Sequence, residues 1–131
     1  MLNSATVTAN IPAGDLKRAR DFYADKLGLI PSFEMADVMM VYQTDGGTVF
    51  SVYQTEYAGQ AGHTIAQWHV EDVEAEVRDL KQKGVAFEQY DMPGMQWHDG
   101  VASMEGMGKA AWFKDSEGNI LCIDDGFPGQ P

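Results

Sequence analysis

Two segments of the chain alternate apolar and polar positions, and each leads into a helical pattern. In the first, Ala9, Ile11 and Ala13 recur with the period of two that is typical of a strand with one buried face. Asp15 is the predicted N-cap of the helix that follows, and Gly28 is its predicted left-handed end. The helix has an apolar face made of Leu16, Ala19, Phe22, Tyr23 and Leu27. The pattern predicts a strand and an amphipathic helix that packs on the sheet of that strand.

The same order recurs over residues 64–84. Ala66, Trp68 and Val70 alternate, Asp72 is the predicted N-cap, and Gly84 ends the second helix as Gly28 ends the first. The apolar stripe of this helix is Val73, Val77 and Leu80. Only two copies occur, and their offset is longer than a typical solenoid repeat, so we predict two fused supersecondary units.

Three further strands are predicted in each half of the chain. They cover residues 30–34, 38–43 and 48–54 in the first half, and 85–89, 109–114 and 119–124 in the second. Turns are predicted at 45–47 and 115–118, a polar linker at 55–62, and a long loop, a candidate lid, from Met92 to Met107. Each half therefore has the order strand, helix, three strands.

Length and charge limit the classes of partner. The 131 residues suffice for one domain, within which we expect one module over about 5–54 and another over about 63–125. Nine Lys and Arg against twenty Asp and Glu give a net charge of −11, which argues against nucleic acid and against anionic membrane surfaces. Neutral or cationic small molecules are compatible with this charge.

The single cysteine excludes an internal disulfide and fits a reducing compartment. The first residues, MLNSATV, lack the basic and apolar segments of a signal peptide, and no apolar run approaches the length of a membrane span. We therefore expect a cytoplasmic protein.

Two segments carry a resemblance to a known family. NIPAGDLKRARDFYADKLGL near the start and AAWFKDSEGNILCI near the end resemble the most recognisable segments of the glyoxalase/bleomycin-resistance/extradiol-dioxygenase superfamily, also called the vicinal-oxygen-chelate superfamily. The resemblance spans essentially the whole chain. It implies a single α+β domain of two βαβββ modules, whose curved sheets form an incomplete barrel around a groove, and it implies a homodimer. It says little about which ligand or reaction is involved.

The resemblance also locates the positions that hold metal in the metal enzymes of the family, where a His, Glu or Gln points into the groove from the first and last strand of each module. The matching positions here are Thr8, Ser51, Ile65 and Cys122. None is a His or a carboxylate, whereas a divalent metal needs several oxygen or imidazole ligands that converge. We therefore predict no metal and no cofactor.

Two alternatives concern the same groove. Side chains alternate between the two faces of a strand, and His63, His69 and Asp124 fall on the same groove-facing side as these positions. A shifted metal site would use these three residues. Cys122 would be a nucleophile if His69 or His98 activated it, whereas a free cysteine on a strand is more often a small core residue.

Strand parity divides the aromatic residues. Phe50 and Trp68 fall on the helix-facing side and are predicted core, whereas Tyr53, Trp97 and Trp112 are predicted to form a stacking wall. Polar groups beside them would orient a planar or cationic organic molecule. The full candidate binding set is Thr8, Asn10, Ser51, Tyr53, Gln67, His69, Trp97, Trp112, Cys122 and Asp124.

Three classes of function follow from these residues. The first is metal-free binding of a small organic molecule, as in the drug-binding members of the family. The second is a metal-dependent lyase, isomerase or dioxygenase with a shifted metal site. The third is a regulatory or accessory module with a vestigial groove. The sequence favours the first.

Overall fold

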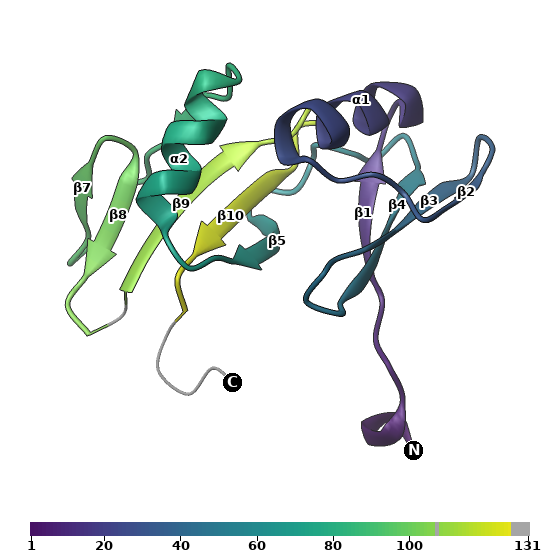
Figure 1. The fold of residues 1–131 in the computed structure, drawn as a ribbon, viewed down its shortest axis with the longest axis horizontal. Helices are drawn as coiled ribbons and strands as arrows, with labels where there is room; N and C mark the ends of the chain where they lie inside the picture. The colour runs from purple at the N-terminus through teal and green to yellow at the C-terminus, as the bar shows by residue number, and fades with distance from the viewer. Residues whose placement is uncertain (107, 127–131) are drawn as a thin grey trace.

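Two units, each a sheet with one helix, lie side by side along the long axis of the molecule (Figure 1). The computed structural model describes residues 1–106 and 108–126. After a short 3-10 turn, Leu2–Ser4, the first unit comprises β1 (Ala9–Ala13), α1 (Leu16–Leu27), β2 (Phe33–Met35), β3 (Met39–Gln43) and β4 (Val49–Gln54). The second comprises β5 (Thr64–His69), α2 (Val73–Gln82), β6 (Phe87–Glu88), β7 (Gln96–His98), β8 (Val101–Met104), β9 (Gly108–Lys114) and β10 (Ile120–Asp124). The fold is α+β, as predicted.

The two sheets have matching topology. The first has the strand order β1-β4-β3-β2, and the second has the order β5-β10-β9-β8-β7, with β6 paired to β9. β1 pairs in parallel with β4, so Asn10 lies opposite Ser51. In the same way β5 pairs in parallel with β10, so Gln67 lies opposite Cys122. The predicted internal repeat is thus confirmed.

Both helices begin at the predicted caps. The Asp15 carboxylate accepts a hydrogen bond from the Arg18 N–H at 3.1 Å, and the Asp72 carboxylate accepts one from the Ala75 N–H at 3.0 Å. Gly28 ends α1 at a φ of 71°, a left-handed conformation that favours glycine. None of the described helices is long and apolar enough to cross a membrane.

The prediction of a loop over 92–107 is wrong for most of this segment, because β7 and β8 form an antiparallel hairpin there. Its turn is Asp99-Gly100, with φ values of 51° and 86°, and such a pair favours a tight hairpin. Val101 and Ala102 on β8 are buried, which explains why the segment is ordered on the sheet. Met107 lies outside the described residues.

The hairpin also corrects the strand assignment of the second half. β8 pairs with β9, so it occupies the position that β2 occupies beside β3. The segment predicted as a strand over 85–89 forms only the two-residue β6. In the first half, the strand predicted over 30–34 is displaced to Phe33–Met35, since Pro31 has no N–H to donate to the sheet.

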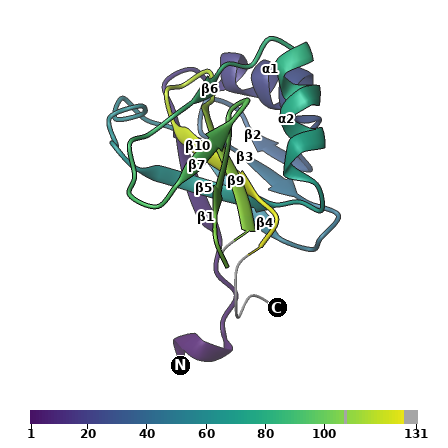
Figure 2. The ribbon, with the colours of Figure 1, turned by 90° about the vertical axis from the view of Figure 1, so that its left-hand side faces the viewer.

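Both helices cover the same side of the molecule (Figure 2), and the core lies between them and the sheets. A row of aromatic rings crosses this core from one unit to the other. Tyr42 stacks on Phe50 with ring centroids 5.0 Å apart, and Phe50 meets Trp68 of β5 edge to face at 5.7 Å. Phe50 and Trp68 therefore belong to the core, as predicted, and the opposite face of the sheets is left for polar residues.

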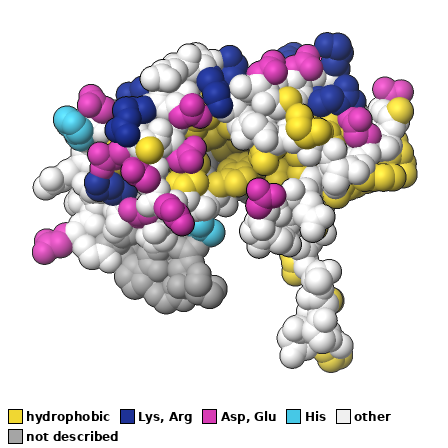
Figure 3. All heavy atoms as spheres, viewed as in Figure 1, with side chains coloured by type: hydrophobic (Ala, Val, Ile, Leu, Met, Phe, Trp, Pro, Cys, Tyr) yellow, Lys and Arg dark blue, Asp and Glu magenta, His cyan; other side chains and the backbone are white. Residues whose placement is uncertain are grey.

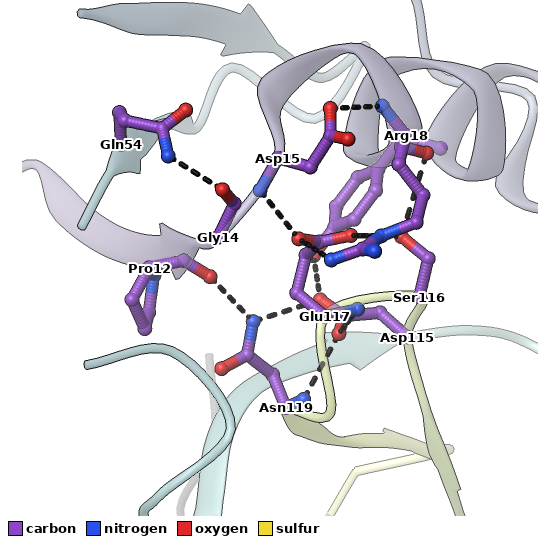
Figure 4. A network of polar contacts seen from close by, with 10 residues as sticks. Pro12, Gly14, Asp15, Arg18, Gln54, Asp115, Ser116, Glu117 and Asn119 are labelled. Atoms are coloured by element: carbon purple, nitrogen blue, oxygen red, sulfur yellow. Dashed lines mark hydrogen bonds and ion pairs between the residues drawn. The ribbon is translucent and has the colours of Figure 1, made fainter. Parts of the chain in front are cut away.

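The turn between β9 and β10 ties the second unit to the start of α1 (Figure 4). The Glu117 carboxylate accepts the Asp15 N–H at 2.9 Å and two N–H groups of Arg18, from Nε at 2.8 Å and Nη2 at 2.9 Å. Burial opposes the charge of Glu117, but these hydrogen bonds outweigh it and hold the pKa of its carboxyl below its ordinary value. The contact is therefore a charge-assisted clamp between residues far apart in the sequence.

Beneath this clamp, the same turn is anchored by buried groups. The Asp115 carboxylate accepts a hydrogen bond from the Tyr23 hydroxyl at 2.8 Å and another from the Asn119 side-chain amide at 2.9 Å. That amide also donates to the Pro12 carbonyl at 2.8 Å. The turn thus fixes β10 of one unit against α1 and β1 of the other.

Candidate functional site

The candidate residues lie on the strands in two groups, one in each unit. The first unit has Asn10 on β1, Ser51 and Tyr53 on β4, and Thr8 just before β1. The second unit has Gln67 and His69 on β5, Trp97 on β7, Trp112 on β9, and Cys122 and Asp124 on β10. Side chains alternate between the faces of a strand, and Ile11, Val52, Leu121 and Ile123 fill the core on the helix side. The candidate residues on these strands have the opposite parity, as predicted.

In the first unit, the polar pair is Asn10 and Ser51. The Ser51 hydroxyl is buried and donates to the Asn10 side-chain carbonyl. Asn10 and Tyr53 line a cavity of about 460 Å³ together with residues of the β2–β3 turn and β3. Tyr53 is 40% exposed there, so its ring is available for contact with a ligand.

In the second unit, the polar group is centred on Asp124. Its carboxylate is buried, accepts hydrogen bonds from the Gln67 side-chain amide and from the Gly126 N–H at 2.7 Å, and lies 3.0 Å from His69 Nδ1. Burial works against the charge of Asp124, but the hydrogen bonds from Gln67, His69 and Gly126 outweigh it and lower the pKa of the carboxyl. The result is a fixed, buried carboxylate on the face of the sheet opposite the helices.

Three aromatic rings form a second cluster in the same unit. Trp112 meets Trp97 of β7 at a centroid distance of 5.9 Å, and it meets Tyr90 edge to face at 5.9 Å. The Trp112 Nε1–H donates to the Thr64 hydroxyl at 3.1 Å, which fixes the orientation of the ring. Trp97 and Trp112 are therefore brought together, whereas Tyr53 lies on the other unit.

Tyr90 is a part of this cluster that sequence analysis missed. It follows β6 in an irregular segment, where no periodicity indicates which way a side chain points. Its hydroxyl is buried without a hydrogen-bond partner among the residues that the structure describes. Burial raises the pKa of Tyr90, so the hydroxyl stays protonated. It is a donor that a bound polar group would satisfy.

A cavity of about 550 Å³ lies where the two units meet. β1 contributes Ala9 and Ile11 to its lining, and β5 contributes Ile65, Gln67 and His69. Gln67 and His69 therefore face this space while they hold Asp124 from the side. A cavity of this size accommodates a drug-sized ligand.

Cys122 has the surroundings of a core residue. It is 1% exposed, and burial together with the charge of Asp124 raises the pKa of its thiol to about 12. A nucleophilic cysteine needs a lowered pKa and access to substrate. The structure therefore favours the core interpretation of Cys122.

The donor set does not fit a divalent metal ion. Within residues 1–106 and 108–126, no three His, Cys, Asp or Glu side chains come together as a metal site would require. A shifted metal site would need His63, His69 and Asp124 together. His69 contacts Asp124, whereas the ring of His63 is exposed and lies 3.0 Å from the Thr64 carbonyl. The four positions that hold metal in related enzymes carry the hydroxyls of Thr8 and Ser51, the alkyl side chain of Ile65 and the protonated thiol of Cys122.

The lowered pKa of Asp124 predicts a pH-dependent contribution to stability. In the unfolded chain the carboxyl titrates near 3.8, so its hydrogen bonds stabilise the fold above this pH and are lost as the pH falls through the lower, folded pKa. We expect Asp124→Asn to reduce the free energy of unfolding by about 1 to 2 kcal/mol at neutral pH, and by less as the pH falls below 3.8. Urea unfolding at a series of pH values measures the difference. An equal loss at every pH would contradict it, and Asp45→Asn, in an exposed turn, is the control.

The model of the Glyoxalase/Bleomycin resistance protein/Dioxygenase superfamily matches residues 5–123. The chain belongs to this superfamily. The match covers both units, from the residues before β1 to β10, and it agrees with the family resemblance of the two sequence segments. No curated protein shows a significant match to the chain.

Solved structures of the superfamily share this fold. The bleomycin resistance determinant encoded on transposon Tn5 has a TM-score of 0.70 at 18% identity, covering 94% of this chain and 98% of its own. FosX, a fosfomycin resistance protein from Listeria monocytogenes solved with Mn(II), has a TM-score of 0.69 at 15% identity, with coverages of 95% and 92%. TnmS3, an antibiotic binding protein from Streptomyces sp. CB03234, has a TM-score of 0.62 at 18% identity, with coverages of 92% and 96%. At these identities the likeness concerns the fold alone.

Proposed function

We propose that this superfamily member binds a planar or positively charged organic molecule on the open face of its sheets, without a metal ion. The observation that carries the proposal is that Asp124 and Trp112 lie on the same face of the second sheet. Trp112 pairs with Cys122 across β9 and β10, and Asp124 is two residues further along that face of β10. A sheet face that carries both aromatic rings and a fixed negative charge suits an aromatic cation.

Other features support a cationic ligand and a binding role. The net charge of −11 attracts cations over a distance that extends beyond the site. Two relatives of the same fold, the bleomycin resistance determinant and the antibiotic binding protein TnmS3, are named for their response to a drug. By this analogy, the ligand class is a drug-like or metabolite-like aromatic compound.

We also propose that the protein is a cytoplasmic homodimer. Large apolar side chains stay exposed in and around β2, at the outer edge of the first sheet: Ile30, Phe33, Met35 and Val38. An apolar patch of this kind is typical of a protein interface. Light scattering coupled to size-exclusion chromatography would measure the mass, and a monomer at micromolar concentration would contradict the dimer.

The experiment that tests the function has two arms. Elemental analysis of untagged protein, before and after dialysis against zinc, nickel, manganese and iron, measures bound metal. A thermal-shift screen then compares planar aromatic cations, such as acridine orange, with neutral aromatic compounds of similar size. We expect no stoichiometric metal and a saturable rise in melting temperature with cations, which Asp124→Asn reduces.

The other outcomes contradict the proposal in different ways. Stoichiometric metal would favour a lyase, isomerase or dioxygenase with a shifted metal site. Neither metal nor ligand binding would favour an accessory module with a vestigial groove. A preference for cations that persists in Asp124→Asn would remove the role of the carboxylate, and Asp45→Asn is the matched control for the loss of one negative charge.

A further inference from the structure

A third cavity lies on the helix side of the molecule. It has a volume of about 160 Å³ and lies between the end of α1, the middle and end of α2, and the second sheet. Figure 3 shows apolar side chains at the bottom of the hollow between the two helices. Both units contribute to it, since Leu27 and Leu29 come from the first, and Trp68, Leu80 and Phe113 come from the second.

The floor of this cavity is apolar and packs against the core. Leu80, Phe113 and Ile123 are at most 5% exposed and belong to the core cluster. Trp68 and Val70 of the second unit close the side nearest β5 and pack against the same cluster. Water gains few hydrogen bonds in such a space, so an apolar occupant is favoured over water.

The charged residues at the rim are mostly engaged with one another. The Lys83 ammonium lies 3.0 Å from the Asp79 carboxylate, and the Lys26 ammonium donates to the Lys83 carbonyl. With Glu76, the rim holds two cationic and two anionic side chains and so has no net charge. These groups give a charged ligand no net electrostatic advantage, and the cavity therefore suits a neutral molecule.

We propose that this cavity is a binding site for one small neutral hydrocarbon-like molecule, about the size of a single substituted aromatic ring. An engineered protein cavity of roughly 150 Å³, lined by Leu, Ile and Phe, stays dry and binds benzene. The cavity here has a similar volume and a similarly apolar floor, below a rim of four charged side chains. The proposal does not depend on the function proposed for the groove, because neither Asp124 nor Trp112 lines this cavity.

Toluene is a suitable probe, and Trp68 is the reporter. The chain has three tryptophans, and replacing Trp97 and Trp112 with phenylalanine leaves Trp68 as the only one. We expect toluene to change the emission of Trp68 saturably, with one molecule bound per chain, and to raise the melting temperature. Titration of the double variant, and of the wild-type chain by thermal shift, measures both.

A matched pair of substitutions locates the response, because Trp68 also lines the larger cavity between the units. Of these two cavities, Val70 lines only the smaller, apolar one, and Val7 lines only the larger one. Val70→Phe fills the proposed site and is expected to weaken toluene binding about tenfold or more, a loss of about 1.4 kcal/mol or more. Val7→Phe makes the same chemical change elsewhere and is expected to leave the response intact.

The remaining outcomes overturn the proposal. An unsaturable response to toluene would show partitioning without a site. A response that Val7→Phe removes and Val70→Phe retains would place the site in the larger cavity. If circular dichroism shows that Val70→Phe does not fold, Leu29→Phe fills the same cavity from the first unit, and a full response in that variant would count against the site. Failure here leaves the groove proposal untouched, since acridine orange and Asp124→Asn test that one.

Discussion

Replacing Asp115 with alanine is expected to lower the free energy of unfolding by about 4 kcal/mol. Asp115 is 5% exposed, and its carboxylate accepts four hydrogen bonds: from the Tyr23 hydroxyl, the Asn119 side chain, and the N–H groups of Glu117 and Asn119. Truncation leaves these buried donors without an acceptor, and each such loss destabilises a fold by about 1 to 3 kcal/mol. Urea unfolding of both chains at neutral pH measures the change.

Single-contact variants test whether the network is the cause. Burial and the neighbouring charge of Asp115 raise the pKa of Tyr23, so its hydroxyl remains a donor at all ordinary pH values. Tyr23→Phe removes only that donor and should cost about 1 to 2 kcal/mol. The double variant of Tyr23→Phe and Asp115→Ala should be less destabilised than the sum of the two single variants.

The control for the Asp115 prediction is Asp45→Ala, because Asp45 is exposed in the β3–β4 turn and has no positive φ. A surface carboxylate of this kind contributes little to stability, so the variant should unfold close to wild type. A loss below about 1 kcal/mol in Asp115→Ala would contradict the anchoring role of the turn.

Replacing Trp112 with alanine is expected to weaken the binding of acridine orange about 30-fold, which corresponds to about 2 kcal/mol. Trp112 is the centre of the aromatic cluster, because it contacts both Trp97 and Tyr90. Its removal deletes the stacking surface and also the support that holds the other two rings. Equilibrium titration of dye fluorescence measures the dissociation constant.

The conservative variant separates stacking from general damage. Trp112→Phe keeps an aromatic face, so we expect a loss of only about threefold, a difference that falls within the range of single aromatic contacts. Tyr57→Ala removes an aromatic ring that is 67% exposed outside the groove, and it should leave the affinity unchanged. Unchanged affinity in both Trp112→Ala and Trp97→Ala would contradict the aromatic wall.

Local interactions explain why most elements were predictable from the sequence. The caps at Asp15 and Asp72 and the left-handed Gly28 act within one helical turn, so the helix ends can be predicted from these residues. The β7–β8 hairpin also has a local signal, the Asp99-Gly100 turn. It was missed because the flanking strands are short and the Met and Gly content of the segment is typical of a loop.

The candidate site was predictable in part. Strand parity put Gln67, His69 and Asp124 on one face, because successive side chains of a strand alternate. Parity does not say that these side chains meet. His69 and Asp124 are 55 positions apart, and only the parallel register of β5 and β10 brings them to 3.0 Å. Tyr90 has no periodic pattern at all, so its contact with Trp112 follows from packing.

The sequence by itself determined the repeated order of strand and helix, the family, and the absence of metal-binding residue types at the four family positions, since these depend on residue identity and short-range spacing. Tertiary structure alone decided which residues touch. It joined the 115–119 turn to α1, buried Cys122, and opened two cavities where the units meet. The physical reason is that these contacts link residues far apart in the chain, and their register depends on how two whole units pack.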